Sequence, residues 1–131
     1  MTPSELIARY VAAARSGDWD AAYAHFAEDM VVRIPGRSAL AGEHRGRQVA
    51  IDYIEHAKAL SRGAEVEVDL IDTLAGAERV ALLVRERFHQ TDGPPIDIHR
   101  ANVYRVVDDR IAEIWIFEGD QYAVDALLGA A

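Results

Sequence analysis

The sequence predicts an α+β fold in which three N-terminal helices pack on a curved, mostly antiparallel sheet and leave a cone-shaped cavity. Apolar residues recur at helical spacing in the first half of the chain and alternate with polar residues in the second half. Short turns join the later segments, so consecutive strands are expected to be antiparallel neighbours. A sheet with one apolar face needs a cover, which the helices supply. The 131 residues suit one domain, 1–131.

Two helices are predicted at the start of the chain. Thr2 caps the first helix, Pro3 fits its first turn, and Gly17 ends it. Asp18 is a suitable cap for the second helix. Four apolar residues share one face of this second helix, namely Trp19, Ala22, Tyr23 and Phe26.

A strand, a loop and a third helix are predicted next. The strand is MVVRI, residues 30–34, and Pro35-Gly36 ends it. Residues 37–46 are small, polar and glycine-rich, which is typical of a loop. The third helix covers about 47–61, because apolar residues recur along one side of it, and Gly63 is its stop signal.

The second half of the chain predicts four strands. They cover residues 64–72, 80–90, 96–107 and 110–118, and turn sequences separate them. The last two strands are joined by the dipeptide Asp-Asp, which predicts a tight hairpin. The final segment, DQYAVDALL, has the pattern of a short helix.

Composition and charge exclude several classes of protein. The chain has no cysteine, which excludes disulfides and thiolate chemistry. Its net charge is −8 and it has no basic run, so we expect no nucleic-acid partner. No apolar stretch approaches the length of a membrane helix, and MTPSELIARY has no basic region before an apolar one. We therefore expect a cytoplasmic protein without a membrane partner.

Cofactor and metal motifs are missing from the sequence. The five histidines show no paired spacing typical of metal ligands, and we expect no metal. The stretch GEHRGR lacks the lysine and serine of a phosphate-binding loop, and the chain has no G-x-G-x-x-G. We therefore expect chemistry, if any, without a cofactor.

Three stretches, ARYVAAARSGDWDAAYAHFAEDMVV, GRQVAIDYI and VYRVVDDRIAEIW, resemble the nuclear-transport-factor-2-like (NTF2-like) superfamily. This superfamily includes ketosteroid isomerase, scytalone dehydratase, limonene epoxide hydrolase and SnoaL-type polyketide cyclases. The resemblance covers nearly the whole chain and implies a single SnoaL-like domain with a cystatin-like α+β barrel. Because the superfamily hosts many chemistries and many plain binders, function has to be argued from the site.

The resemblance to ketosteroid isomerase implies two hydrogen-bond donors in this chain but no catalytic base. Tyr10 matches the tyrosine of the isomerase's first helix in its ARY context, and Asn102, in NVYRV, stands where the isomerase has a protonated aspartate. Together they imply a two-donor site for an oxyanion. The isomerase's base matches Ile34, directly before Pro35, and isoleucine cannot take a proton. Steroid isomerisation is therefore not expected.

Two other relatives imply different acid/base positions. The aspartate that limonene epoxide hydrolase carries on its last strand matches Ile114 or Ile116, so that activity is not expected. SnoaL-type cyclases use an aspartate at or just after the last strand, and Asp120 is the nearest match. They also tend to keep a histidine on the preceding strand, for which His99 is the candidate.

Strand alternation places some of these residues on one face and some on the other. Arg100, Asn102 and Tyr104 share one face of their strand, and the isomerase match turns this face inward. His99 then points away from the pocket. Arg100 either contacts the ligand or forms a salt bridge to Glu118 or Glu86, since an unpaired inward charge is expensive.

Structural alternatives exist for the other candidates. The Asn102 amide and the Tyr10 phenol line the pocket or are packing residues with a polar neighbour. Asp120 is a catalytic acid/base or the cap of the C-terminal helix. His44 overhangs the cavity mouth or lies in a solvated loop, and Trp19 lines the pocket or packs in the core.

The functional hypothesis is a small-molecule-binding protein with a mostly apolar, cone-shaped pocket. It performs cofactor-free proton transfer, as an isomerase, cyclase or dehydratase, on a cyclic or polyketide-like ligand that is neutral or weakly anionic. The alternative is a non-catalytic binding or dimerisation module. The predicted catalytic residues are Asp120, Tyr10 and Asn102. The predicted ligand-binding residues are Arg100, Tyr104, Trp19, Tyr53, Ile34, Ile114, Ile116 and His44.

A homodimer is expected from the other face of the sheet. That face carries apolar positions that a monomer would leave in contact with water. The candidates for the interface are Val103, Trp115 and Phe117.

Overall fold

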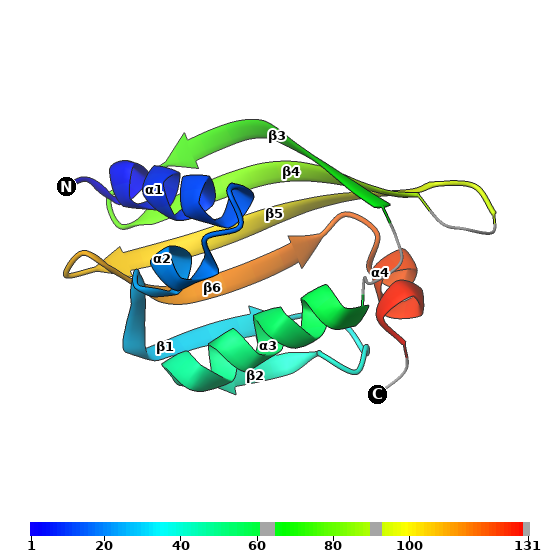
Figure 1. The fold of residues 1–131 in the computed structure, drawn as a ribbon, viewed down its shortest axis with the longest axis horizontal. Helices are drawn as coiled ribbons and strands as arrows, with labels where there is room; N and C mark the ends of the chain where they lie inside the picture. Colours follow the sequence, from blue (N-terminus) through cyan, green and yellow to red (C-terminus); the bar gives the residue numbers. More distant parts are fainter. Residues whose placement is uncertain (61–64, 90–92, 130–131) are drawn as a thin grey trace.

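The computed structural model describes residues 1–60, 65–89 and 93–129. Its centre is a six-stranded sheet with the strand order β2-β1-β6-β5-β4-β3. The sheet curves without closing, and α1, α2 and α3 cover one of its faces (Figure 1). The structure therefore has the predicted α+β architecture, with three N-terminal helices on one side of the sheet.

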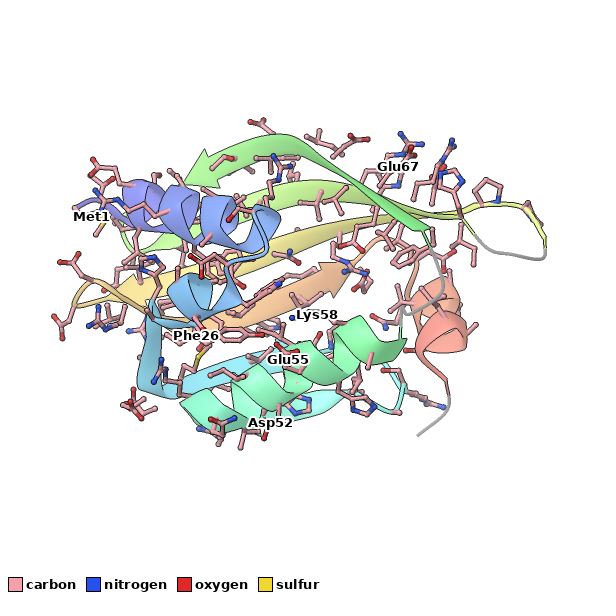
Figure 2. The ribbon with its side chains drawn as sticks, viewed as in Figure 1. Met1, Phe26, Asp52, Glu55, Lys58 and Glu67 are labelled. Atoms are coloured by element: carbon pink, nitrogen blue, oxygen red, sulfur yellow. The ribbon has the colours of Figure 1, made fainter. Side chains whose placement is uncertain are left out.

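The first two helices begin where the caps predict. α1 (Pro3–Arg15) has Thr2 as its cap, whose side chain accepts a hydrogen bond from the N–H of Glu5 at 3.2 Å. α2 (Trp19–Tyr23) is capped by Asp18 in the same way. Phe26 was predicted to lie on this helix, but it is the first residue of β1 (Figure 2). Its backbone pairs with Ile111 of β6, and this tertiary pairing outweighs the local helical spacing.

The predicted loop 37–46 contains a strand. β1 (Phe26–Ile34) pairs antiparallel with β2 (Gly42–Arg45), from Val31 opposite Arg45 to Ile34 opposite Gly42. β2 is the edge strand of the sheet and is mostly exposed, so its sequence GEHR lacks the apolar alternation that marks a half-buried strand. α3 (Arg47–Leu60) follows directly and packs against β1 and β2.

The other four strands form an antiparallel ribbon. They are β3 (Glu65–Ala75), β4 (Arg79–His89), β5 (Ile96–Val107) and β6 (Arg110–Glu118). β3 runs three residues beyond its predicted end because it continues to pair with β4 after an irregularity between Leu70 and Asp72. Asp108 and Asp109, with φ of 51° and 57°, form the predicted tight hairpin between β5 and β6. Some predictions lie outside the described residues. They are the helix stop at Gly63, the strand ends at 64 and 90, and the start of the turn at 91–92.

One pairing departs from the antiparallel pattern. β1 runs parallel to β6, with Val32 opposite Ile114, so the N-terminal hairpin joins the long ribbon through its last strand. The main core lies between this sheet and the helices, and its fully buried side chains include Leu6, Ile7, Met30, Val32, Val80 and Ile111. None of the described helices is long and apolar enough to cross a membrane.

Candidate functional site

A cavity of about 380 Å³ lies between the concave face of the sheet and the helices. β4, β5 and β6 form its floor, while α1, α2, α3 and a fourth helix, α4 (Gln121–Leu128), contribute to its sides. Eight residues predicted for the site line this cavity: Tyr10, Trp19, Tyr53, Arg100, Asn102, Tyr104, Ile114 and Ile116. The inward direction predicted for the Asn102 face of β5 is therefore the observed one.

Two predicted binding residues, Ile34 and His44, are not among the described residues that line the cavity. Ile34 is at the end of β1 and packs against the main core. His44 is on β2, where its Nε2 lies 2.7 Å from the carbonyl oxygen of Leu40. The His44 ring lies 5.1 Å from the ring of Tyr53, which does line the cavity. His44 therefore supports the wall from behind.

Asp120 lies at the start of α4, outside the cavity lining. Its carboxylate accepts a hydrogen bond from the N–H of Ala123 at 3.1 Å and caps the helix. The strand ends at Glu118, and the chain turns at Gly119, whose N–H donates to the carbonyl oxygen of His99 at 2.7 Å. The structure thus gives Asp120 the cap position and leaves His99 exposed on the opposite face of the sheet.

An arginine held by two glutamates forms the charged part of the site. Arg100 Nη1 is 3.0 Å from Glu86 Oε1, and Arg100 Nε is 3.2 Å from the Glu118 carboxylate. The side chains of Arg100 and Glu86 are each 19% exposed and that of Glu118 is 5% exposed. The strand register creates this arrangement. Arg100 of β5 stands directly opposite Glu118 of β6 on one side and Val84 of β4 on the other, and Glu86 is two residues beyond Val84. The salt-bridge interpretation of Arg100 is therefore the observed one, with both predicted partners.

The three charges do not balance. Two carboxylates share one guanidinium, which leaves a formal charge of −1 in a partly desolvated position. Burial raises the pKa of Glu118, against the lowering effect of Arg100, and the nearby Glu86 carboxylate raises it further. Glu86 and Arg100 line the cavity itself, so a ligand there meets one carboxylate and one guanidinium edge.

A tyrosine cluster lies at the α1 end of the cavity. The ring centroids of Tyr10 and Tyr104 are 5.6 Å apart, and both side chains are buried. Burial raises the pKa of Tyr10 well above its usual value, and it raises the pKa of Tyr104 and Tyr53 to about 12. These phenols are consequently neutral at physiological pH and can act as hydrogen-bond donors.

Asn102 lies between the tyrosines and the charged group. A hydrogen bond between its side chain and Tyr104 opposes the effect of burial on the pKa of that phenol. Its Oδ1 atom is buried and accepts no hydrogen bond from any described residue. A buried acceptor without a donor costs about 1–3 kcal/mol. Asn102 lines the cavity with an amide that can donate, as the sequence predicted, and its covered Oδ1 remains an unsatisfied acceptor.

The α3 side of the cavity carries a second ion pair. Lys58 Nζ lies 2.9 Å from Glu55 Oε1 and 4.3 Å from the centre of the Trp19 ring, and both charged residues project from α3 (Figure 2). The hydroxyl of Tyr23 donates to the same Glu55 carboxylate at 2.6 Å. The cation of this wall is thus already paired with a carboxylate and an aromatic face.

α4 lies at the opposite end of the molecule from the start of α1 (Figure 1), and it contributes to the lining of the cavity. Val124 and Leu127 pack with Phe88 and Ile98, and the cavity lining includes Val124, Leu127 and Phe88. Both oxygens of Asp125 accept from the N–H of Arg37 at 3.2 Å, which ties α4 to the loop after β1. Gly36 permits this approach, since any side chain there would collide with Gln121 and Asp125.

Part of this site was not predicted from the sequence. Glu86 and Glu118 were expected only as partners of Arg100, although Glu118 continues the inward alternation of Ile114 and Ile116. No role was expected for the apolar face of α4, because nothing local in DQYAVDALL shows where that helix packs. In the described part of the chain, no three histidine, aspartate or glutamate side chains are grouped so that they could hold a metal ion.

The sequence and the fold match known proteins. Residues 7–114 match the family model described as the SnoaL-like domain. No curated protein matches the sequence significantly. Among solved structures, Bal32a from a soil-derived mobile gene cassette is similar, with 25% identity and a TM-score of 0.84 over 97% of this chain and 96% of that one.

Two further structures share the fold at lower identity. A protein of unknown function with a cystatin-like fold from Xanthomonas campestris is 23% identical, with a TM-score of 0.87 over 98% of this chain and 99% of that one. TerC, co-crystallised with polyporic acid, is 14% identical, with a TM-score of 0.79 over 96% of this chain and 97% of that one. At such identities the likeness shows the fold alone, and it confirms the predicted cystatin-like α+β architecture.

Proposed function

Because this chain belongs to the SnoaL-like domain family, within the NTF2-like superfamily, we propose that it binds a cyclic small molecule in the cavity and transfers a proton on it without a cofactor. The family fold is one that binds small molecules. The observation that carries the proposal is the Arg100–Glu86–Glu118 group, placed beside an apolar, aromatic cavity. Proton transfer needs a positioned acid/base group, which a carboxylate can supply, and a ligand held against it.

Glu86 takes the role of acid/base in this proposal. It lines the cavity, whereas Asp120 caps α4 outside it. Arg100 positions Glu86, and Glu118 competes for the same guanidinium. The Glu86 carboxylate is thereby held at the cavity wall, where it can meet a proton of a bound ligand. The Tyr10 phenol, near the other end of the cavity, serves as a donor to a ligand oxygen.

The test combines binding with proton exchange. Cyclic ketones such as 1-tetralone are screened for an increase in melting temperature, and exchange of their α-protons in D₂O is followed by NMR. We expect binding together with catalysed exchange, and E86Q should lose exchange while it retains binding. If no cyclic or polyketide-like compound raises the melting temperature, the proposal is wrong.

The second candidate is a binding module without catalysis. One observation favours it: both carboxylates are engaged by Arg100, so protonation of either one weakens an ion pair. Binding without any exchange above that of buffer, in wild type and E86Q alike, would support this alternative.

We also propose that the protein is a homodimer formed through the convex face of the sheet. Trp115 is 42% and Phe117 is 47% exposed, and their rings stack with centroids 5.3 Å apart. Val103 stands opposite Trp115 on the neighbouring strand. Large exposed aromatic residues that adjoin on one face are typical of a protein interface.

A further inference from the structure

We propose that the ligand of the cavity carries a protonated amine, which is held by Glu86 and Asn102, and that the cavity rejects carboxylates. This inference rests on the proposed small-molecule binding and names the chemical class of the ligand. Three features of the wall carry it: an excess of negative charge, an unsatisfied acceptor, and a set of aromatic rings.

The charge of the wall favours a cation. Of the described residues that line the cavity, Lys58 and Arg100 are the cations, and both are paired. Lys58 is matched by Glu55, while Arg100 is shared by Glu86 and Glu118. Among the described residues, these two cations together with Glu86 in the wall and Glu55 and Glu118 behind it sum to −1. A cationic ligand supplies the missing positive charge, in surroundings where solvent screens charges less than in bulk water.

Asn102 supplies a hydrogen-bond acceptor beside this charge. On β5 it lies two residues from Arg100 and faces the same cavity. Its Oδ1 is covered and accepts nothing from the described residues, and a ligand N–H would satisfy it once the amide turns towards the cavity. An ammonium group has three donors, so one ligand group can reach both the Asn102 carbonyl and the Glu86 carboxylate.

Aromatic rings complete the recognition of a cation. Tyr10, Tyr53, Tyr104 and Trp19 all line the cavity. The faces of such rings attract cations, and Trp19 already holds the Lys58 ammonium 4.3 Å from its ring centre. The apolar area of these rings also suits the hydrocarbon part of a cyclic amine.

A carboxylate ligand finds no comparable partner in this wall. It would have to displace Glu86 or Glu118 from Arg100, or Glu55 from Lys58, and leave a carboxylate of the protein unpaired. A neutral alcohol can donate to Asn102, but it leaves the excess negative charge in place. The expected order of affinity is therefore amine, then alcohol, then carboxylate, in contrast to the neutral or weakly anionic ligand expected from the sequence.

The experiment compares three bicyclic compounds that differ in one group: 2-aminotetralin, 2-tetralol and tetralin-2-carboxylate. Dissociation constants are measured by calorimetry with the whole chain at neutral pH. We expect the amine to bind at least about tenfold more tightly than the alcohol, because its hydrogen bonds are charge-assisted. We expect no measurable binding of the carboxylate.

Two variants and a control separate the cavity from the overall charge of the protein. E86Q removes the carboxylate that faces the ligand and should reduce the preference for amine over alcohol at least about threefold. E67Q makes the same change in net charge at an exposed site on β3 (Figure 2) and should leave the preference unchanged. N102L should weaken both the amine and the alcohol, which supplies a second measurement if E86Q fails to fold.

The outcomes distinguish this inference from the function on which it rests. If the carboxylate binds as tightly as the amine, or if E86Q and E67Q have equal effects, the amine proposal is overturned while small-molecule binding stands. If none of the three compounds, and no ketone of the earlier screen, binds to the wild-type protein, both proposals fail.

Discussion

The two faces of the β4–β5 ribbon carry ion networks that share their charges differently: the convex one has Arg85 and Arg87 with Asp97 and Asp69, and the concave one has two glutamates on one arginine. On the concave face one arginine, Arg100, is shared by two carboxylates. On the convex face one carboxylate, Asp97, is shared by two arginines, with Arg87 Nε at 2.9 Å and Arg85 Nη2 at 3.2 Å. The concave network is mostly buried, whereas the convex network is open to solvent.

The pKa values of the carboxylates on the two faces are shifted in opposite directions. Burial raises the pKa of Glu118 despite its contact with Arg100. The hydrogen bond from Arg87 lowers the pKa of Asp97 to about 2, and Arg85 adds to the effect. The comparison shows that an ion pair alone does not decide whether a carboxylate holds its proton. Burial and the ratio of partners decide it, and the face with surplus carboxylate is the one that adjoins the cavity.

The largest expected effect comes from the removal of the shared arginine. Arg100→Leu leaves two partly buried carboxylates, 19% and 5% exposed, without a cation and should destabilise the protein by about 3 kcal/mol, as is typical of a broken buried ion pair. The matched variant on the convex face, Arg87→Leu, leaves Asp97 in contact with Arg85 and with water. Its effect should be a small fraction of the first. Urea unfolding at neutral pH measures both values.

Equal losses for the two variants would mean that the concave group is as well solvated as the convex one. The proposed charge excess in the cavity wall would then lack its energetic basis. Measurement in low and high salt sharpens the test, because solvent-exposed ion pairs are screened far more strongly than buried ones.

The second prediction concerns the different partners of the two faces. Trp115→Glu places a charge in the stacked aromatic pair on the convex face. If this face forms the dimer, the substitution should weaken association by about 2 kcal/mol or more, which is typical of a central aromatic residue. Light scattering coupled to size exclusion should show wild type at twice the 14.5 kDa of one chain and the variant shifted towards one chain.

Wild type that elutes as a single chain over the whole concentration range would contradict the dimer. In that case the exposed Trp115 and Phe117 need another explanation. Ligand affinity is the control, because Trp115 points away from the cavity and should not affect it.

A smaller effect is expected in the pH dependence of stability. The folded-state pKa of Glu118 is above its ordinary 4.5, so its contribution to stability is complete below 4.5 and is lost as the pH rises through the folded-state value. Asp97 behaves in the opposite way. Its folded-state pKa of about 2 lies below the ordinary 3.8, so its contribution is present above 3.8 and is lost as the pH falls towards 2.

Unfolding free energies of wild type, E118Q and D97N over the acid range measure the two effects separately. The difference between wild type and E118Q should fall with rising pH, whereas the difference between wild type and D97N should fall with decreasing pH. A difference for E118Q that changes in the same direction as that for D97N would show that Arg100 outweighs burial at Glu118.

The fold was largely predictable because most elements carry their own local signals. Caps at Thr2 and Asp18, alternation in β4 to β6 and the Asp108–Asp109 turn are all local patterns, and the structure confirms them. β2 and the start of β1 at Phe26 depend instead on partners that are distant in sequence, so local spacing did not reveal them.

The site was predictable in outline but not in its charges. Alternation put Arg100, Asn102 and Tyr104 on one face of their strand, and the resemblance to ketosteroid isomerase turned that face towards the cavity that they line. The position of the carboxylates depends on where β6 ends, and an offset of two residues separates Glu118 at the Arg100 group from Asp120 at the helix cap. The free lone pairs of Asn102 depend on its neighbours in three dimensions, which no local pattern encodes.

The smallest expected effect tests whether Asp120 is a helix cap and not a catalytic acid/base. Asp120→Ala removes the side chain that accepts from the N–H of Ala123 and should cost about 1 kcal/mol, whereas Asp120→Asn keeps an effective cap and should cost little. Because Asp120 lies outside the cavity lining, ligand affinity and proton exchange should be unchanged in Asp120→Asn. Loss of exchange in Asp120→Asn, with stability intact, would return the acid/base role to the end of β6 and take it away from Glu86. Hydrogen exchange of the α4 amides measures the cap directly, since a cap mutation should increase exchange in α4 and leave β4 and β5 protected.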